Sequence, residues 1–175
     1  TGTRCFDWEI PPEWNITSAS IKDRAGNVVL DFADNNLHVV GYSEPVSGWF
    51  PLASLKPRIF TLPDQPNSIP HLTSYYHRAW GFCMAHKDLL ALEDGEYFVE
   101  INSRLEPGEL IVSEARLPGT SEKEILISCY YCHPSLANDG LSGVVLAAQL
   151  YQELAPQERY YGYRFLFMPE TIGAI

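Results

Sequence analysis

The segment Ile125-Leu-Ile-Ser-Cys-Tyr-Tyr-Cys-His133-Pro-Ser-Leu-Ala-Asn-Asp139-Gly-Leu-Ser-Gly143 joins an apolar run to the start of a predicted helix. The nearly continuous apolar run from Glu124 to Cys132 is typical of a strand that is covered on both faces. A histidine follows the run, and an aspartate comes six positions later. An imidazole and a carboxylate can both bind metal, so the segment predicts either a metal-binding loop or a plain turn before a helix.

The residues after this loop predict a strand–helix–strand unit. Apolar residues at helical spacing indicate a helix that ends before Pro156, with Asp139 or Ser142 as its cap. The segment from Tyr160 to Met168 then reads as a second strand with one aromatic face. A unit of this length is expected to be parallel and right-handed.

Three polar side chains are predicted to meet at one edge of this unit. His133 follows the first strand, Glu170 follows the second, and Asp139 lies in the loop between strand and helix. Ligands of open α/β sheets bind at the carboxyl ends of the strands. We therefore expect His133 and Asp139 to bind zinc, with Glu170 as the general base that accepts a proton from water.

Each of these residues also has a plainer interpretation. A histidine at a strand end is often a hydrogen-bonded structural residue, Asn138-Asp139-Gly140 is a turn with a helix cap, and Glu170 is a solvated strand-end residue. The pattern Cys129-Tyr-Tyr-Cys132 lies in the predicted strand, where residues three apart point to opposite faces, so packing cysteines are expected. Only the convergence of all three residues favours the metal site.

The chain before this unit reads as a β-rich domain over residues 14–117, and residues 118–175 read as part of an α/β core. The fold class is α/β in this core and α+β overall. The expected elements are a hairpin (15–22 and 28–33), strands at 37–42, 96–103 and 109–117, and a short helix at 87–92.

An aromatic segment inside the β-rich region offers a second candidate site. Tyr76 and Trp80 could line a substrate cleft, and Arg78 could bind a carboxylate there. The alternative is that the rings pack in the core and that Arg78 is an ordinary surface residue.

Composition narrows the classes of partner. Lys and Arg number 12 against 22 Asp and Glu, a formal net charge of −10, so neither nucleic acid nor an anionic membrane is expected as a partner. Four cysteines are too few for a disulfide scaffold, and no apolar run reaches the ~20 residues of a membrane span. We expect a cytoplasmic protein, and we leave self-association open; a small peptide or other amide as substrate is what the family resemblance described below implies. Neither end of the sequence resembles a natural terminus, so we expect this chain to be a piece of a longer protein.

Two motifs resemble those of a known family. Cys132-His-Pro-Ser-Leu-Ala-Asn-Asp-Gly-Leu-Ser-Gly143 and Pro169-Glu-Thr-Ile-Gly173 are similar to motifs of bacterial and archaeal proteins with an aminopeptidase-like domain, related to the M28 zinc peptidases. Ser74-Tyr-Tyr76 and Trp80-Gly-Phe-Cys83 are similar to motifs of the β domain inserted in that family, long of unknown function.

The resemblance implies an α/β zinc-hydrolase core, to which residues 1–13 and 118–175 belong in part, interrupted by an inserted β domain at residues 14–117. It implies that His133 is the first metal histidine, that Asp139 is the metal aspartate, and that Glu170 is the general base. Ser135 and Thr171 depart from the M28 pattern, which has acidic residues there. One zinc ion is therefore expected rather than two.

Two functions follow as hypotheses. The first is a zinc-dependent aminopeptidase-like hydrolase that cleaves an amide or peptide bond. The alternative is a catalytically inactive binding or regulatory protein on a peptidase scaffold, which Ser135 and Thr171 favour. Residues 14–117 could also serve as a docking module for assembly.

Overall fold

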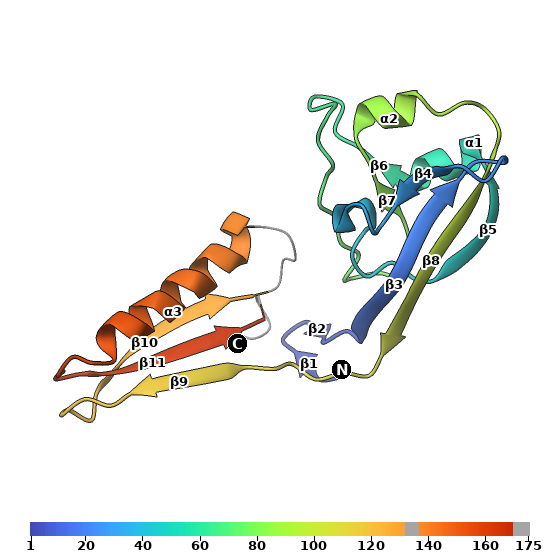
Figure 1. The fold of residues 1–175 in the computed structure, drawn as a ribbon. Helices are drawn as coiled ribbons and strands as arrows, with labels where there is room; N and C mark the ends of the chain where they lie inside the picture. The colour runs from blue at the N-terminus through green and yellow to red at the C-terminus, as the bar shows by residue number, and fades with distance from the viewer. Residues whose placement is uncertain (132–136, 170–175) are drawn as a thin grey trace. The chain divides into compact units, whose positions relative to one another are not determined.

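The computed structural model describes residues 1–131 and 137–169, and the chain divides into two compact units (Figure 1). Unit 1 comprises Thr1–Gly2 and Pro11–Gly108, and unit 2 comprises Thr3–Ile10 and Glu109–Ile175. The described elements are mostly strands with a few helices, which confirms the predicted α+β fold.

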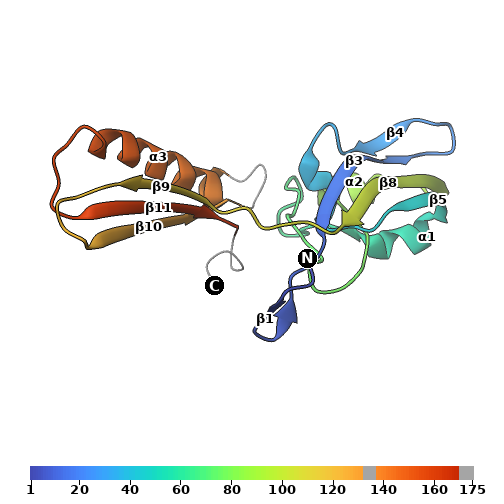
Figure 2. The ribbon, with the colours of Figure 1, turned by 90° about the horizontal axis from the view of Figure 1, so that it is seen from below.

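Unit 1 contains a four-stranded antiparallel sheet with the strand order β4-β3-β8-β5 (Figure 2). Its strands are β3 (Glu13–Lys22), β4 (Val28–Asp31), β5 (Val46–Pro51) and β8 (Glu96–Glu106). The predicted hairpin is confirmed, since β3 and β4 pair antiparallel across the turn that Asp23 and Asn27 close.

The core of unit 1 lies on one face of this sheet. Along β8, Tyr97, Val99 and Ile101 are buried at every second position, as expected of a strand with one face in the core. The segments that cover this face are α1 (Leu52–Leu55), α2 (His86–Leu90), and the parallel pair β6 (Ile59–Phe60) and β7 (Phe82–Cys83). The 3₁₀ turn η2 (Lys56–Arg58) joins α1 to β6 and has no buried residue. Helix α2 confirms the short helix expected at 87–92.

The strand predicted at 37–42 is wrong. A 3₁₀ turn, η1 (Asn36–His38), occupies the start of this segment. The Asn35 side chain accepts a hydrogen bond from the Leu37 backbone amide at 3.0 Å, so a local side-chain cap competes with strand pairing. Only isolated bridges follow, from Val39 to Phe82 and from Gly41 to Thr73.

Unit 2 contains a three-stranded sheet with the order β10-β11-β9 and one covering helix. Its elements are β9 (Ser113–Leu117), β10 (Glu124–Tyr130), α3 (Ser142–Leu154) and β11 (Gly162–Met168), with a short hairpin of β1 (Arg4–Cys5) and β2 (Trp8–Glu9). Strands β10 and β11 are parallel, as predicted for a strand–helix–strand unit. Phe165 is fully buried under Ala147 and Tyr151 of α3.

Two expectations for this region differ from the structure. Strand β9, predicted to belong with the β-rich region to residue 117, pairs antiparallel with β11, and Leu117 is buried in the core of unit 2. Strand β10 was expected to be covered on both faces, but only the face toward α3 is packed, and Leu126 is 61 % exposed. Among the described residues, no helix combines the length and apolar character required to span a bilayer.

The buried Cys83 thiol predicts a loss of stability in alkaline solution. Burial raises the pKa of this thiol from 9.0 to about 12. The unfolded chain therefore releases a proton that the folded chain retains, and the free energy of unfolding falls as the pH rises above 9. Between pH 8 and pH 10, we expect the Cys83 thiol to lower the free energy of unfolding by about 1 kcal/mol. Urea unfolding at each pH provides the measurement. Cys83→Ala should lower stability at every pH but flatten this slope, and an unchanged slope would contradict the assignment.

Candidate functional site

The carboxyl ends of β10 and β11 lie side by side in unit 2. Their register runs from Glu124 opposite Gly162 to Tyr130 opposite Met168, and the Tyr131 backbone amide donates to the Met168 carbonyl at 3.0 Å. Ligands of α/β sheets bind at this kind of edge. The edge that the sequence predicted is therefore present.

The loop that carries Asp139 folds back onto the end of β10. Within the irregular turn η3 (Ala137–Leu141), Gly140 is buried with φ of 140° and ψ of −38°. A Cβ atom at this position would lie 3.1 Å from the Tyr130 carbonyl oxygen. Only glycine adopts this backbone conformation without strain, and only glycine allows this close approach. Gly140 thus positions the neighbouring Asp139 over the strand end.

The Asp139 carboxylate is held by a tyrosine from the strand. The Tyr130 hydroxyl donates a hydrogen bond to Oδ1 of Asp139 at 2.5 Å. A hydrogen bond to a charged acceptor is stronger than one between neutral groups, so it restricts the rotation of the carboxylate. The Asp139 side chain stays exposed, and a carboxylate is a type of side chain that can bind a metal ion.

The predicted capping role for this loop is wrong. Helix α3 begins at Ser142, and its start has no hydrogen bond from a capping side chain. The Ser142 hydroxyl donates instead to the Asn138 carbonyl at 2.9 Å. The Asp139 carboxylate accepts its hydrogen bond from the Tyr130 hydroxyl. The alternative interpretation, in which Asp139 only caps the helix, therefore does not explain the position of this side chain.

His133, Cys132 and Glu170 lie outside the described residues, so their predicted roles stay predictions. Within residues 1–131 and 137–169, no three His, Cys, Asp or Glu side chains form a group that could hold a metal ion. Cys129 is a free thiol that packs beside the unit 2 core, and burial raises its pKa. Of the two predicted metal ligands, Asp139 is the one that lies within the described residues. A carboxylate oxygen is a type of ligand that zinc binds.

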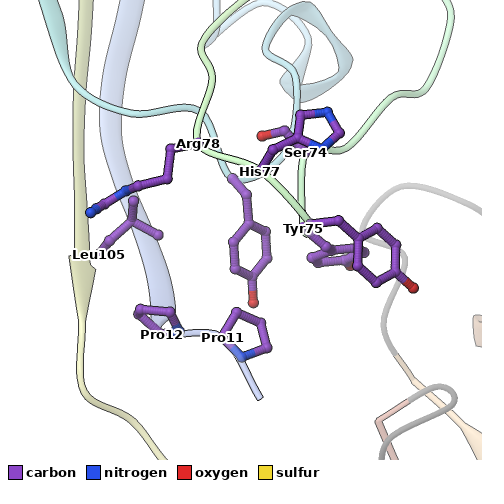
Figure 3. Close-up of a pocket in the computed structure, with 9 residues that line it drawn as sticks. Pro11, Pro12, Ser74, Tyr75, His77, Arg78 and Leu105 are labelled. Carbon is purple, nitrogen blue, oxygen red and sulfur yellow. The ribbon is translucent and has the colours of Figure 1, made fainter. Parts of the chain in front are cut away.

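A pocket in unit 1 brings together two of the other predicted residues (Figure 3). It has a volume of about 210 Å³, and Pro11, Pro12, Tyr42, Tyr75, Tyr76 and Arg78 are among the residues that line it. Nε of Arg78 lies 2.8 Å from a carboxylate oxygen of Glu44. Trp80 packs against Phe50 at 5.4 Å and under the Arg58 guanidinium at 5.2 Å, which matches the packing alternative.

Tyr42 is a pocket residue that the sequence did not indicate. Its φ of 66° lies in the left-handed region, which a bulky residue rarely adopts. Burial raises the pKa of its phenol, and the nearby Tyr75 and Glu13 raise it further, so the hydroxyl remains protonated at neutral pH. No local sequence pattern predicts such a conformation for tyrosine.

The chain belongs to a family of domains of unknown function, DUF2172, which matches residues 13–104. Over all 175 residues it is 46 % identical to a Clostridium acetobutylicum protein named "Putative polysaccharide biosynthesis protein with aminopeptidase-like domain", of which it spans 40 %. A crystal structure named as a "putative peptidase" from the same organism matches 99 % of this chain and 41 % of its own, with 46 % identity and a TM-score of 0.95. The fold is therefore peptidase-like, and one relative is named for an aminopeptidase-like domain and the other as a peptidase.

The conformation of Gly140 makes a prediction about the loop. We expect Gly140→Ala to lower the free energy of unfolding by about 1–3 kcal/mol, because the new Cβ occupies a strained φ and approaches the Tyr130 carbonyl. Gly143→Ala is the matched control: it lies in α3, its Cβ would meet only ordinary contacts, and alanine favours helix. Urea unfolding of both variants provides the measurement, and equal stabilities would contradict the loop conformation.

Proposed function

We propose that the whole protein is a zinc-dependent aminopeptidase-like hydrolase that cleaves an amide bond. The observation that carries this proposal is the Asp139 carboxylate, held by Tyr130 at the shared carboxyl edge of β10 and β11. The relatives named as a peptidase and as an aminopeptidase-like protein support the same class of reaction. The chain spans about 40 % of those relatives, so further parts of the site would come from other residues of the whole protein.

In this proposal, His133 and Asp139 would hold one zinc ion. When bound, the ion supplies Lewis acidity toward the carbonyl of the scissile amide. Glu170 would accept a proton from the attacking water and return it to the leaving amine. Tyr130 would hold Oδ1 of Asp139 in place and so restrict the orientation of the carboxylate as a ligand.

The printed name of one relative suggests where the amide is carried. That relative is described as a polysaccharide biosynthesis protein with an aminopeptidase-like domain. An N-acyl amino sugar contains an amide on a saccharide and satisfies both parts of the name. We propose this substrate class ahead of peptides.

The first test concerns the general base. In the whole protein loaded with zinc, Glu170→Gln should remove hydrolysis of N-acyl amino sugars while zinc content, measured by atomic emission, stays the same. Aminoacyl-p-nitroanilides run in parallel distinguish a peptidase from a hydrolase of amino sugars. Activity that survives in Glu170→Gln would overturn the role of Glu170.

The second test concerns Tyr130 and uses zinc affinity as its readout. Competition with a chromophoric chelator should show Tyr130→Phe binding zinc roughly 10- to 100-fold more weakly, as expected when a partner that orients a metal ligand is lost. Asp139→Asn should weaken zinc binding further than Tyr130→Phe does. Tyr131→Phe is the matched control, because the Tyr131 hydroxyl donates to the Ile111 carbonyl and not to Asp139. Equal zinc affinities of the two tyrosine variants would exclude a positioning role for Tyr130.

The alternative function is a catalytically inactive binding or regulatory protein on the same scaffold. Ser135 and Thr171, at positions where the M28 pattern has acidic residues, favour it. A whole protein that takes up no zinc at neutral pH but binds an amino sugar without turnover would support this alternative.

A further inference from the structure

The sheet of unit 2 has an outer face, turned away from α3, that carries large apolar side chains (Figure 1). Along β10, Ile127 and Cys129 pack against the core under α3. Side chains alternate between the two faces of a strand, so Leu126, Ser128 and Tyr130 lie on the outer face. Leu126 is 61 % exposed and Tyr130 is 38 % exposed. The apolar pattern of β10 is therefore only half used by the described residues.

Strand β11 extends this apolar surface. Phe165 and Phe167 belong to the core under α3, so Leu166 between them lies on the outer face. In the register of the two strands, Leu166 is opposite Ser128, which lies between Leu126 and Tyr130. These apolar residues are therefore neighbours on one face, and we call them the outer patch: Leu126, Tyr130 and Leu166.

The opposite end of the same face is charged. Arg164 forms ion pairs with Glu124 at 2.7 Å and with Glu114 at 3.4 Å. Arg116 forms a further pair with Glu124 at 3.0 Å. An apolar centre beside a polar, solvated rim is the usual anatomy of a surface that another protein segment covers.

The edge of the sheet at β10 lacks the features that protect a natural edge. Within the part of the chain that the structure describes, β11 is the one strand paired with β10. The segment from Ile125 to Tyr130 contains neither a charged residue nor a proline, which are common protections of an edge strand. The opposite edge strand, β9, is shorter and carries Glu114 and Arg116. We therefore expect a further strand of the sheet beside β10.

The handedness of crossover connections determines where the helix before such a strand lies. The chain passes from β10 to β11 through α3, and connections of this kind are right-handed. A step from β11 back past β10 crosses the sheet in the opposite direction. To remain right-handed, that step must run over the face opposite α3, which is the outer face.

Helix α3 also presents more apolar surface than its contacts with the sheet use. Tyr151 packs on the core of unit 2, yet Val145 is 59 % exposed and Leu146 is 67 % exposed. Its exposed polar residues include Gln149 and Glu153, which lie one turn apart. Apolar residues around most of a helix are typical of a helix inside a larger core. Unit 2 thus has unfilled apolar surface on both sides of its sheet.

We propose that the outer patch is covered by a crossover helix of the same polypeptide, from the part of the whole protein that follows residue 175. More than half of each relative lies outside the segment that this chain matches, which is enough chain for such a helix. The helix would place an apolar face on Leu126 and Leu166 and polar residues toward the charged rim. This proposal concerns the packing of unit 2 and does not depend on the zinc site.

A second copy of the protein is the competing occupant. In a two-fold dimer the same surface of each copy forms the contact. Such a contact can pair two β10 edges or bury two outer patches, but one contact of this kind does not do both. A crossover helix and the strand that follows it cover the face and the edge together, so the observations favour the same chain.

The first measurement is the reactivity of a cysteine placed at the patch in the whole protein. Leu126→Cys should react with N-ethylmaleimide at least about 100-fold more slowly in the native than in the urea-denatured protein, because a thiol beneath a helix reacts only when the structure opens. Gln149→Cys, at an exposed position of α3, is the matched control and should be slowed by less than about tenfold. Peptide mass spectrometry separates each site from the four native cysteines.

The second measurement identifies the segment that covers the patch. With p-benzoylphenylalanine in place of Leu126, irradiation should produce a cross-link to a peptide beyond residue 175 in a product of monomer mass. Equal protection of Leu126→Cys and Gln149→Cys, protection that is lost on dilution, or a cross-link at dimer mass would each overturn the proposal. A cross-link to residues 1–175 would overturn it as well. The labelling test uses a side chain smaller than leucine, so it stands where the bulky photoreactive group disturbs packing.

Discussion

The arrangement of unit 2 depends on the parallel register of β10 and β11. This register pairs Tyr130 with Met168 and so brings the loop after β10 and the segment after β11 to one edge. The Arg164–Glu124 ion pair at 2.7 Å also joins the strands, but both side chains are about one-third exposed, and such pairs contribute ~1 kcal/mol or less. Burial of Phe165 beneath α3 is the larger effect, since a fully buried aromatic side chain contributes about 1.5–3 kcal/mol. A shift of one residue would turn that ring away from the helix.

The register alone does not place Asp139, because a loop can leave a strand end in many directions. Two local features together determine where the loop places Asp139. Gly140 permits a backbone path that approaches the Tyr130 carbonyl, and the Tyr130 hydroxyl then binds the carboxylate. One tyrosine therefore contacts the loop through its backbone and through its side chain. This double contact holds the carboxylate at Tyr130, and no side chain caps the start of α3.

The sequence predicted those parts of the fold that rest on short-range periodicity. The hairpin of β3 and β4, helix α3 and the parallel β10–β11 pair each show a regular apolar pattern along the chain. The strand predicted at 37–42 was wrong because the Asn35 side chain competes locally with strand pairing. Strand β9 was correctly predicted as a strand but assigned to the wrong region, because its partner β11 lies about 50 residues further on. Asp139 was predicted as a ligand from its residue type and position, and this stays a prediction, whereas the Tyr130–Asp139 hydrogen bond is a contact that no spacing rule describes.

Tyr42 marks a further limit of sequence reasoning and a different way to build a site. A left-handed conformation costs a bulky residue about 1–2 kcal/mol, and no local sequence pattern predicts it for tyrosine. The compensation comes from Ser43, whose hydroxyl and carbonyl are bonded to four partners distant in sequence or across the turn. At about 1 kcal/mol for each hydrogen bond, these contacts outweigh the strain. Glycine at position 42 would relieve the strain, but it would also remove the ring contacts with Trp14 and Tyr75. The Tyr42 ring therefore both packs within unit 1 and lines the pocket.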